Sequence, residues 1–377
     1  VDALDLELIA ADELLTWKLS VPVSTLHKLK DDKEEAKKLF STLIKTVSES
    51  TMTVTEETWN ELLETMLKIQ VDVLYTLRDV DVVTILAEHL LRSNNMDDIT
   101  LAVKFLDGEI SGQYKLSDCI SKEDKEKLIL DVVRDYFNKS RDYDDDEIEL
   151  AKYCLHFLDQ SSLPVVEEFD LISALGILEQ HNVKILPIKV RYCEDKTKLI
   201  EECLSNKPSS YKRIQPLLKL ACFLRLQYED KKMLESTVYY LCAQYAFQVK
   251  DYKKCCDYCQ KLVSNSFCDA WKMCYQLGSC EELEDSALKE NLLSFALAYC
   301  PGEKMLDVLK SKRKVEVSVL LQQVKLNSFE RSSQAPSDDS SFISTMNPLS
   351  LLPGKIPMHL DAVVCATKDT TKVLLDL

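Results

Sequence analysis

Three cysteines in the stretch DYKKCCDYCQKLV have the spacing that most invites metal or redox chemistry. Cys256 and Cys259 are separated by two residues, as in many zinc and dithiol sites. A zinc site needs about four ligands, and no second C-x-x-C or close His pair supplies the others. The apolar and sulfur residues also share one helical stripe, which predicts buried core: Tyr252, Cys255, Cys256, Cys259, Leu262 and Val263. A metal or redox protein that uses Cys256 and Cys259 remains an alternative to a protein without chemistry of its own.

The acidic run Asp142, Asp144, Asp146 resembles the start of a calcium-binding loop. Its sixth position holds Glu147, where the sharp turn requires Gly, and its twelfth holds Tyr153, where a bidentate Glu is required. We therefore predict a solvated acidic turn that stabilises the N-terminus of the next helix.

Other charged and nucleophilic residues give no catalytic constellation. The basic cluster Lys310, Lys312, Arg313, Lys314 is compatible with an import signal or an anion contact, but in an acidic chain a solvated helix junction is favoured. The five histidines are far apart: His27, His89, His156, His181 and His359. His181 is expected to satisfy carbonyls at a helix end. Nucleophile elbows, phosphate-binding glycine loops and H-E-x-x-H are absent from the sequence. We predict no catalytic, cofactor-binding or metal residues and no enzymatic activity; partner-binding residues are unknown.

Composition favours a mainly helical chain. The 377 residues include only six Gly and ten Pro. The formal charge of −16 disfavours direct binding to nucleic acid or anionic membranes.

The fourteen Cys are scattered and follow no secretory leader, so we expect reduced thiols. No apolar run reaches the length that a membrane-spanning helix needs. We also expect the chain to be a piece of a longer protein.

Hydrophobic periodicity predicts one helix after another, joined by short connections. No fixed repeat period fits, so the predicted fold is all-α, an irregular α-solenoid of antiparallel helix pairs over 1–326. Residues 327–357 are rich in Ser, Asp and Pro and predict a flexible loop or linker, and 358–377 predict a further, truncated helical segment. The expected helices are 2–18, 32–47, one of about five turns capped by Thr53, 80–91, 96–106, one capped by Ser121, one carrying residues 148–157, 196–204, 209–226, 232–249, 251–263, 267–276, 287–299 and 304–325.

The stretch FDLISALGILEQHNVKILPIKVR (Phe169 to Arg191) is the most distinctive part of the chain. Its first half predicts an amphipathic helix that ends at His181 and Asn182. We interpret Val183 to Leu186 as a buried extended connector and Pro187 as the first residue of a short helix.

Five stretches together resemble one family. They are TEETWNELLETMLKIQVDVL (Thr55 to Leu74), Phe169 to Leu204, DYKKCCDYCQKLV (Asp251 to Val263), DAWKMCYQLG (Asp269 to Gly278) and ENLLSFALAYCP (Glu290 to Pro301). In continuous order they are similar to the helical domain of the neuroblastoma-amplified sequence (NBAS) family, large subunits of the endoplasmic-reticulum tethering complex NRZ, which correspond to the secretory subunit of the yeast Dsl complex.

The resemblance implies an α-solenoid scaffold without chemistry of its own. Such a subunit would work in Golgi-to-endoplasmic-reticulum retrograde transport with ZW-ten-type and RINT-type tether subunits and with Use-type and syntaxin-type SNAREs. It would be cytoplasmic and peripheral at the endoplasmic reticulum membrane, held there through protein partners. Within the scaffold class the alternative is a Rod-like kinetochore subunit, which shares the architecture and a ZW-ten partner.

Overall fold

The computed structural model describes residues 3–50, 54–109, 120–226 and 230–333. Within these ranges every regular element is a helix and no strand occurs. The prediction of an all-α chain is therefore confirmed for the described residues. The chain divides into two units, Val1–Val319 and Leu320–Leu377, and the packing described below lies in the first.

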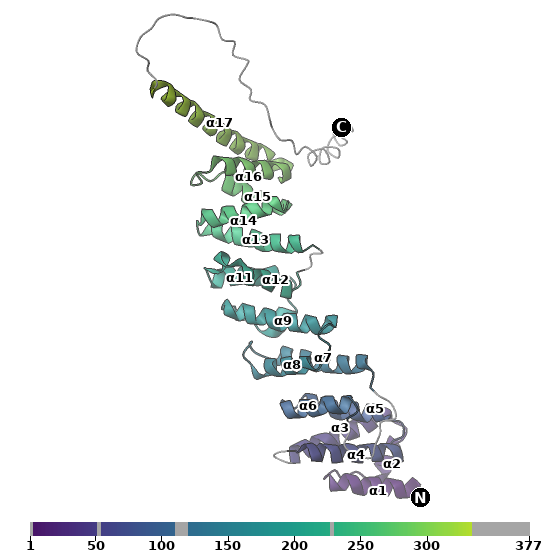
Figure 1. Cartoon of the computed structure of the whole chain (residues 1–377). Coiled ribbons are helices and arrows are strands. Elements are labelled where there is room, and N and C mark those ends of the chain that lie inside the picture. Colours follow the sequence, from purple (N-terminus) through teal and green to yellow (C-terminus); the bar gives the residue numbers. More distant parts are fainter. Residues whose placement is uncertain (1–2, 51–53, 110–119, 227–229, 334–377) are drawn as a thin grey trace, which may run out of the picture. The chain divides into compact units, whose positions relative to one another are not determined.

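The helices have short to medium length, apart from the last one, and short connections join most of them (Figure 1). They are α1 (Ala3–Thr16), α2 (Val23–Leu29), α3 (Lys33–Ser50), α4 (Glu56–Asp72), α5 (Asp79–Leu91), α6 (Met96–Leu106), α7 (Lys122–Lys139), α8 (Asp146–His156), α9 (Leu163–Gln180), α10 (Pro187–Arg191), α11 (Thr197–Asn206), α12 (Ile214–Phe223), α13 (Lys231–Gln248), α14 (Tyr252–Ser264), α15 (Trp271–Gly278), α16 (Ser286–Tyr299) and α17 (Gly302–Ser333). Two 3-10 helices, η1 (Ser210–Lys212) and η2 (Cys268–Ala270), precede α12 and α15.

Side-chain caps explain where two of the helices begin. The Ser121 hydroxyl accepts a hydrogen bond from the Asp124 N–H at 3.0 Å, which confirms the predicted cap of α7. The predicted cap at Thr53 is wrong, because Glu56 is the first residue of α4 and Thr55 precedes it. The Thr55 hydroxyl accepts from the Thr58 N–H at 3.3 Å. Thr53 itself lies outside the described residues.

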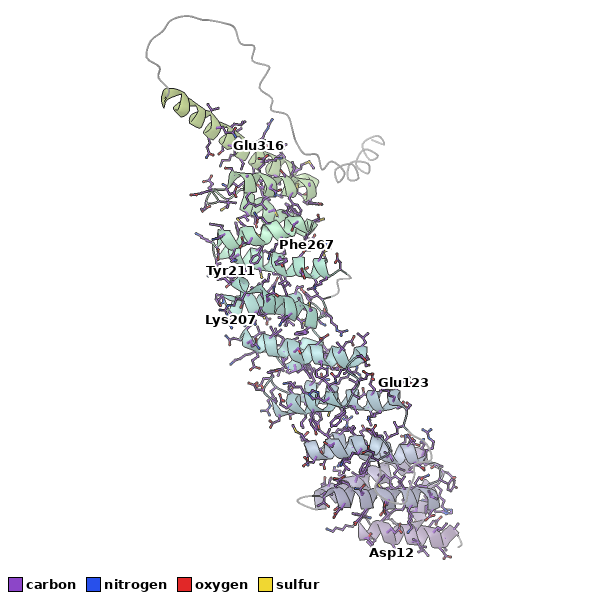
Figure 2. All side chains as sticks on the ribbon, in the orientation of Figure 1. Asp12, Glu123, Lys207, Tyr211, Phe267 and Glu316 are labelled. Atoms are coloured by element: carbon purple, nitrogen blue, oxygen red, sulfur yellow. The ribbon has the colours of Figure 1, made fainter. Side chains whose placement is uncertain are left out.

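The apolar faces of the helices meet chiefly between neighbours in the chain. Helix α5 packs on α6, α7 on α8, α13 on α14 and α15 on α16, and α9 packs on α12 (Figure 1). Side chains fill the spaces between these helices (Figure 2). The buried residues form one cluster that extends from Ala10 to Val308. Burial of apolar area between successive helices is thus the main stabilising contribution.

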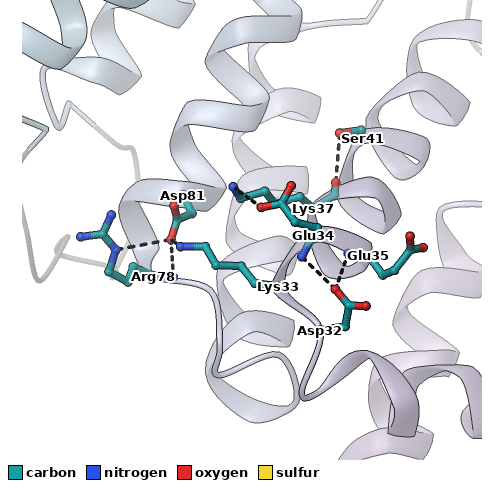
Figure 3. Close-up of polar contacts among 8 residues, drawn as sticks. All are labelled: Asp32, Lys33, Glu34, Glu35, Lys37, Ser41, Arg78 and Asp81. Carbon is teal, nitrogen blue, oxygen red and sulfur yellow. Dashed lines mark hydrogen bonds and ion pairs between the residues drawn. The ribbon is translucent and has the colours of Figure 1, made fainter.

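A polar contact adds to the packing of α3 on α5. The Lys33 ammonium lies 2.8 Å from the Asp81 carboxylate, which also accepts a hydrogen bond from the Arg78 backbone N–H at 3.0 Å (Figure 3). Asp32 accepts from the Glu34 N–H at 3.1 Å and so satisfies a donor in the first turn of α3 (Figure 3). The Lys33–Asp81 pair thus joins the start of α3 to α5, and the other two bonds satisfy donors at the starts of these helices.

The distinctive stretch folds largely as predicted, with one correction. Helix α9 ends at Gln180, and Asn182 has a φ of 59°, in the left-handed region that Asn tolerates. Pro187 is the first residue of α10, as expected. The connector is only partly buried, however: Val183 is 4% exposed, but Leu186 is 44% exposed. Its extended backbone turns alternate side chains to opposite sides, so only some of its apolar residues can face the core.

Other elements differ from the sequence-based prediction at their boundaries. The short helix α2 lies between the predicted helices 2–18 and 32–47 and was not expected; Pro22 is its N-cap. Helix α17 continues to Ser333, so the first residues of the segment predicted as a linker are helical. The remainder of that segment and all of 358–377 lie outside the described residues.

Trp59 provides a test of the packing of α4. It is 3% exposed and its ring centroid lies 6.2 Å from that of His89 in α5. We expect Trp59→Ala to lower the free energy of unfolding by about 3–5 kcal/mol, measured by urea denaturation, because it leaves a cavity between two helices.

The matched control is Tyr75→Ala, since Tyr75 is an aromatic residue that is 62% exposed. This variant should change the free energy of unfolding by about 0.5 kcal/mol or less. Equal effects of the two substitutions would contradict the burial of Trp59.

Candidate partner-binding surface

The three cysteines singled out by their spacing are core residues of α14. Cys255 and Cys259 are fully buried and Cys256 is 8% exposed, so the prediction of buried core is confirmed. Burial raises the pKa of the Cys256 thiol to about 11, and hydrogen bonds with the Cys255 and Cys274 thiols raise the pKa of Cys259 well above its ordinary value. Such thiols are poor nucleophiles at neutral pH. Among the described residues no group of three or more His, Cys, Asp or Glu is placed to hold a metal ion.

The acidic run forms the loop between α7 and α8. Asp142, Asp144 and Asp146 are exposed, and the Asp144 N–H donates to the Asp142 carboxylate at 3.2 Å. Asp145 precedes α8 and accepts from the Arg141 N–H at 2.8 Å. The prediction of a solvated acidic turn before a helix is therefore confirmed.

The basic cluster lies inside α17, which corrects the predicted helix junction. The residues are solvated as expected, and two of them have acidic neighbours: Lys314 lies 3.0 Å from Glu281 and Lys312 lies 3.7 Å from Glu316. A continuous helical pattern through Val308 and Val315 carries the helix past the charges.

The histidines also have local roles. His181 Nδ1 lies 2.8 Å from the Ile177 carbonyl oxygen at the end of α9, which confirms its predicted position at helix-end carbonyls. His27 Nδ1 lies 3.0 Å from the Glu7 carboxylate. His359 lies outside the described residues.

The most connected polar cluster of the described chain is built around Glu168, which sequence reasoning missed. Arg191 of α10 donates two hydrogen bonds to the Glu168 carboxylate, at 2.6 and 3.0 Å, and Arg134 of α7 donates a third at 2.9 Å. Arg191 also donates to Asn138 at 3.1 Å and lies over the Phe137 ring, 4.7 Å from its centroid. Glu168 is 3% exposed.

The sequence did contain a signal for the burial of Glu168. This residue has the helical spacing of the buried stripe of α9, which includes Val165, Ile172 and Leu175.

The α7–α8 loop, α9 and the connector to α10 enclose a groove of about 460 Å³. We call it the connector groove. Its lining combines apolar and charged side chains: Arg141, Asp142, Tyr143, Leu175, Glu179, Asn182, Val183, Lys184, Ile185 and Leu186. The distinctive stretch Phe169 to Arg191 thus supplies most of a surface hollow as well as core.

The rim of the connector groove is anchored from both sides. The Lys207 ammonium donates to the Gln180 carbonyl at 3.0 Å, and Asn206 donates to the Asn182 carbonyl at 3.1 Å (Lys207 is labelled in Figure 2). These bonds satisfy carbonyls that the end of α9 leaves free. The end of α9 is therefore held by α11, and α10 is held by the Glu168 cluster.

The rim also carries negative charge. Partial burial, with the Asp144 and Asp142 carboxylates nearby, raises the pKa of Glu179 above its ordinary value. Nothing in this arrangement supplies a nucleophile with an adjacent base or a set of metal ligands. A hollow lined by apolar side chains and by both acidic and basic residues is suited to binding another molecule.

No helix among the described residues is both long enough and apolar enough to cross a bilayer.

The described residues define a class of protein: an all-helical chain in which successive helices pack on one another around one buried cluster. The chain belongs to the family of the secretory pathway protein Sec39, whose family model matches residues 1–330.

Two relatives illustrate the membership. The chain is 33% identical over 334 residues to the NBAS subunit of the NRZ tethering complex from Homo sapiens, a match that covers 86% of this chain and 14% of the human protein. It is 25% identical over 194 residues to MAG2-interacting protein 2 from Arabidopsis thaliana, covering 50% of this chain and 8% of that protein. The resemblance to the NBAS family is thereby confirmed, and the chain spans only a small part of the length of these relatives.

Removal of the central carboxylate tests the Glu168 cluster. We expect Glu168→Ala to lower the free energy of unfolding by about 3–5 kcal/mol in urea denaturation, because the Arg191 guanidinium, 14% exposed, would lose its carboxylate partner. The matched control is Asp135→Ala, which removes a 45% exposed carboxylate paired with Arg92 and should cost about 1 kcal/mol or less. A cost for Glu168→Ala as small as that of the control would show that the cluster contributes little.

Thiol labelling tests the core assignment of the cysteines. At pH 8 a thiol of pKa about 11 is only about one thousandth thiolate, so Cys256 should react far more slowly than exposed Cys222 and Cys268. Mass-spectrometric mapping of the native chain after brief alkylation should find Cys256 and Cys259 unlabelled, and labelled after unfolding. Rapid native labelling of these two, or stoichiometric zinc whose removal unfolds the chain, would support the redox or metal alternative.

Proposed function

We propose that this chain is the helical part of a non-enzymatic scaffold subunit of a vesicle-tethering complex. The observation that carries the proposal is the 33% identity, over 86% of the chain, to a subunit of the NRZ tethering complex. The match of the Sec39 family model to residues 1–330 supports a role in the secretory pathway. The proposed process is Golgi-to-endoplasmic-reticulum retrograde transport.

The proposed architecture is an irregular α-solenoid of antiparallel helix pairs. Packing between successive helices supports it, since each pair buries its apolar faces on neighbours and leaves a long polar surface free. Such a surface can hold several partners at once without chemistry of its own. The buried thiols of α14 disfavour the cysteine-based redox alternative.

The proposed partners are ZW-ten-type and RINT-type tether subunits and the Use-type and syntaxin-type SNAREs. The protein would be peripheral at the endoplasmic reticulum membrane through these partners. The formal charge of −16 supports attachment through proteins, because an acidic chain is repelled by anionic lipid surfaces.

Direct binding measurements test the assignment. The purified 377-residue chain should bind a RINT-type subunit, a ZW-ten-type subunit or the cytosolic domain of a Use-type SNARE in calorimetry at about 0.15 M salt, where non-specific charge attraction is screened. An unrelated helical protein of similar negative charge is the control. A folded chain that binds none of them would refute the tether assignment, whereas binding only to the ZW-ten-type subunit would favour the Rod-like kinetochore alternative.

A further inference from the structure

The connector groove has a preformed apolar floor. Leu175 and Val183 are 3% and 4% exposed and form its base, and Tyr143 closes one side. Gly176 permits this closure: a Cβ at that position would lie 2.9 Å from Cε2 of Tyr143. The Lys152 ammonium lies over the Tyr143 ring, 4.3 Å from its centroid. The floor is therefore built by packing that needs no ligand, which reduces the ordering cost of binding.

Apolar surface continues from the groove onto the outside of the connector. Leu186, at the groove edge, is 44% exposed, and Ile188 of α10 is 38% exposed. A β-branched and a γ-branched side chain beside a hollow form the kind of surface on which the apolar face of a partner helix packs. Leu186 is thus available as a contact residue.

The charge around the groove identifies what the apolar occupant should carry. Asp142, Asp144 and Glu179 form no ion pair with any described cation. Arg141 and Lys184 also line the groove, yet the charged groups that shift the pKa of Glu179 are the two aspartates, which raise it. A basic side chain placed at Glu179 would relieve this repulsion, and an anionic membrane would increase it.

We propose that the connector groove docks a segment of another tether subunit that inserts an apolar side chain over Leu175 and Ile185 and places a Lys or Arg against Glu179. This inference rests on the proposed function and adds to it a location and a partner chemistry. Helix-in-groove binding with a charge at one edge is an established mode of recognition, and the charge sets the register of the segment.

Two substitutions in the full chain test the proposal. Glu179→Lys places a positive charge where the partner's cation should lie, and Leu186→Asp places a charge on the apolar edge. Each should weaken binding of a RINT-type or ZW-ten-type subunit by about tenfold or more in calorimetry, as expected for a central contact. The matched controls are Glu290→Lys on α16 and Leu163→Asp, a 63% exposed leucine at the other end of α9, and both should stay within about twofold of the unsubstituted chain.

The second measurement exchanges the charges of Glu179 and of the partner's basic residue, after the partner segment has been identified. A photo-crosslinking amino acid at position 186 of the full chain identifies that segment by mass spectrometry. That segment should contain a Lys or Arg beside apolar residues, and its replacement by Glu should restore binding to Glu179→Lys while weakening binding to the unsubstituted chain. Circular dichroism melting confirms that each variant is folded.

The outcomes separate this inference from the proposed function. If the unsubstituted chain binds neither tether subunit and no SNARE, the proposed function and the docking site both fail. If it binds a SNARE but neither tether subunit, the docking site alone fails. If it binds and the groove variants bind like the controls, the docking site alone is overturned. Loss of SNARE binding only, or a crosslinked segment without a basic residue, also overturns it.

Discussion

The fold depends on the burial of one helix's apolar stripe against the next helix in the chain. Helices of 10–18 residues are marginal in isolation, so their stability must come from packing. Pairs such as α5 with α6 and α13 with α14 provide it locally, and contacts such as α9 with α12 join the pairs. Because most of these contacts join helices that are adjacent or close in sequence, the core can extend along the chain from Ala10 to Val308.

At α9 and α10 this packing includes a charged group. Glu168 occupies a position on the buried stripe and is compensated by Arg134 and Arg191, which come from helices on either side of it in the chain. An ion pair of this kind adds little net stability compared with apolar residues, but it penalises other arrangements of the three helices, in which the carboxylate would be buried alone. We infer that the Glu168 cluster favours the observed packing of α7, α9 and α10 over other arrangements.

The same stretch connects structure with the proposed role. Most chemically suggestive residues have structural roles, as Cys259 in the core and His181 at a helix end illustrate. At the surface, this part of the chain presents an acidic turn, an exposed apolar edge at Leu186 and the connector groove. A scaffold in a tethering complex requires such shaped surfaces, since its contribution is to hold partners at defined positions.

The sequence by itself determined the helical class, most helix positions, the core assignment of the α14 cysteines and the family. These properties depend on local periodicity, capping and composition, which are readable along a single chain. It misplaced the cap of α4, omitted α2 and placed the whole connector in the core, because boundaries and exposure depend on neighbouring helices. Only the tertiary structure decided that Glu168 meets Arg134 and Arg191, and that Asp142 and Glu179 border one groove. Such pairings join residues more than 20 positions apart, and their proximity arises from helix packing that no local pattern encodes.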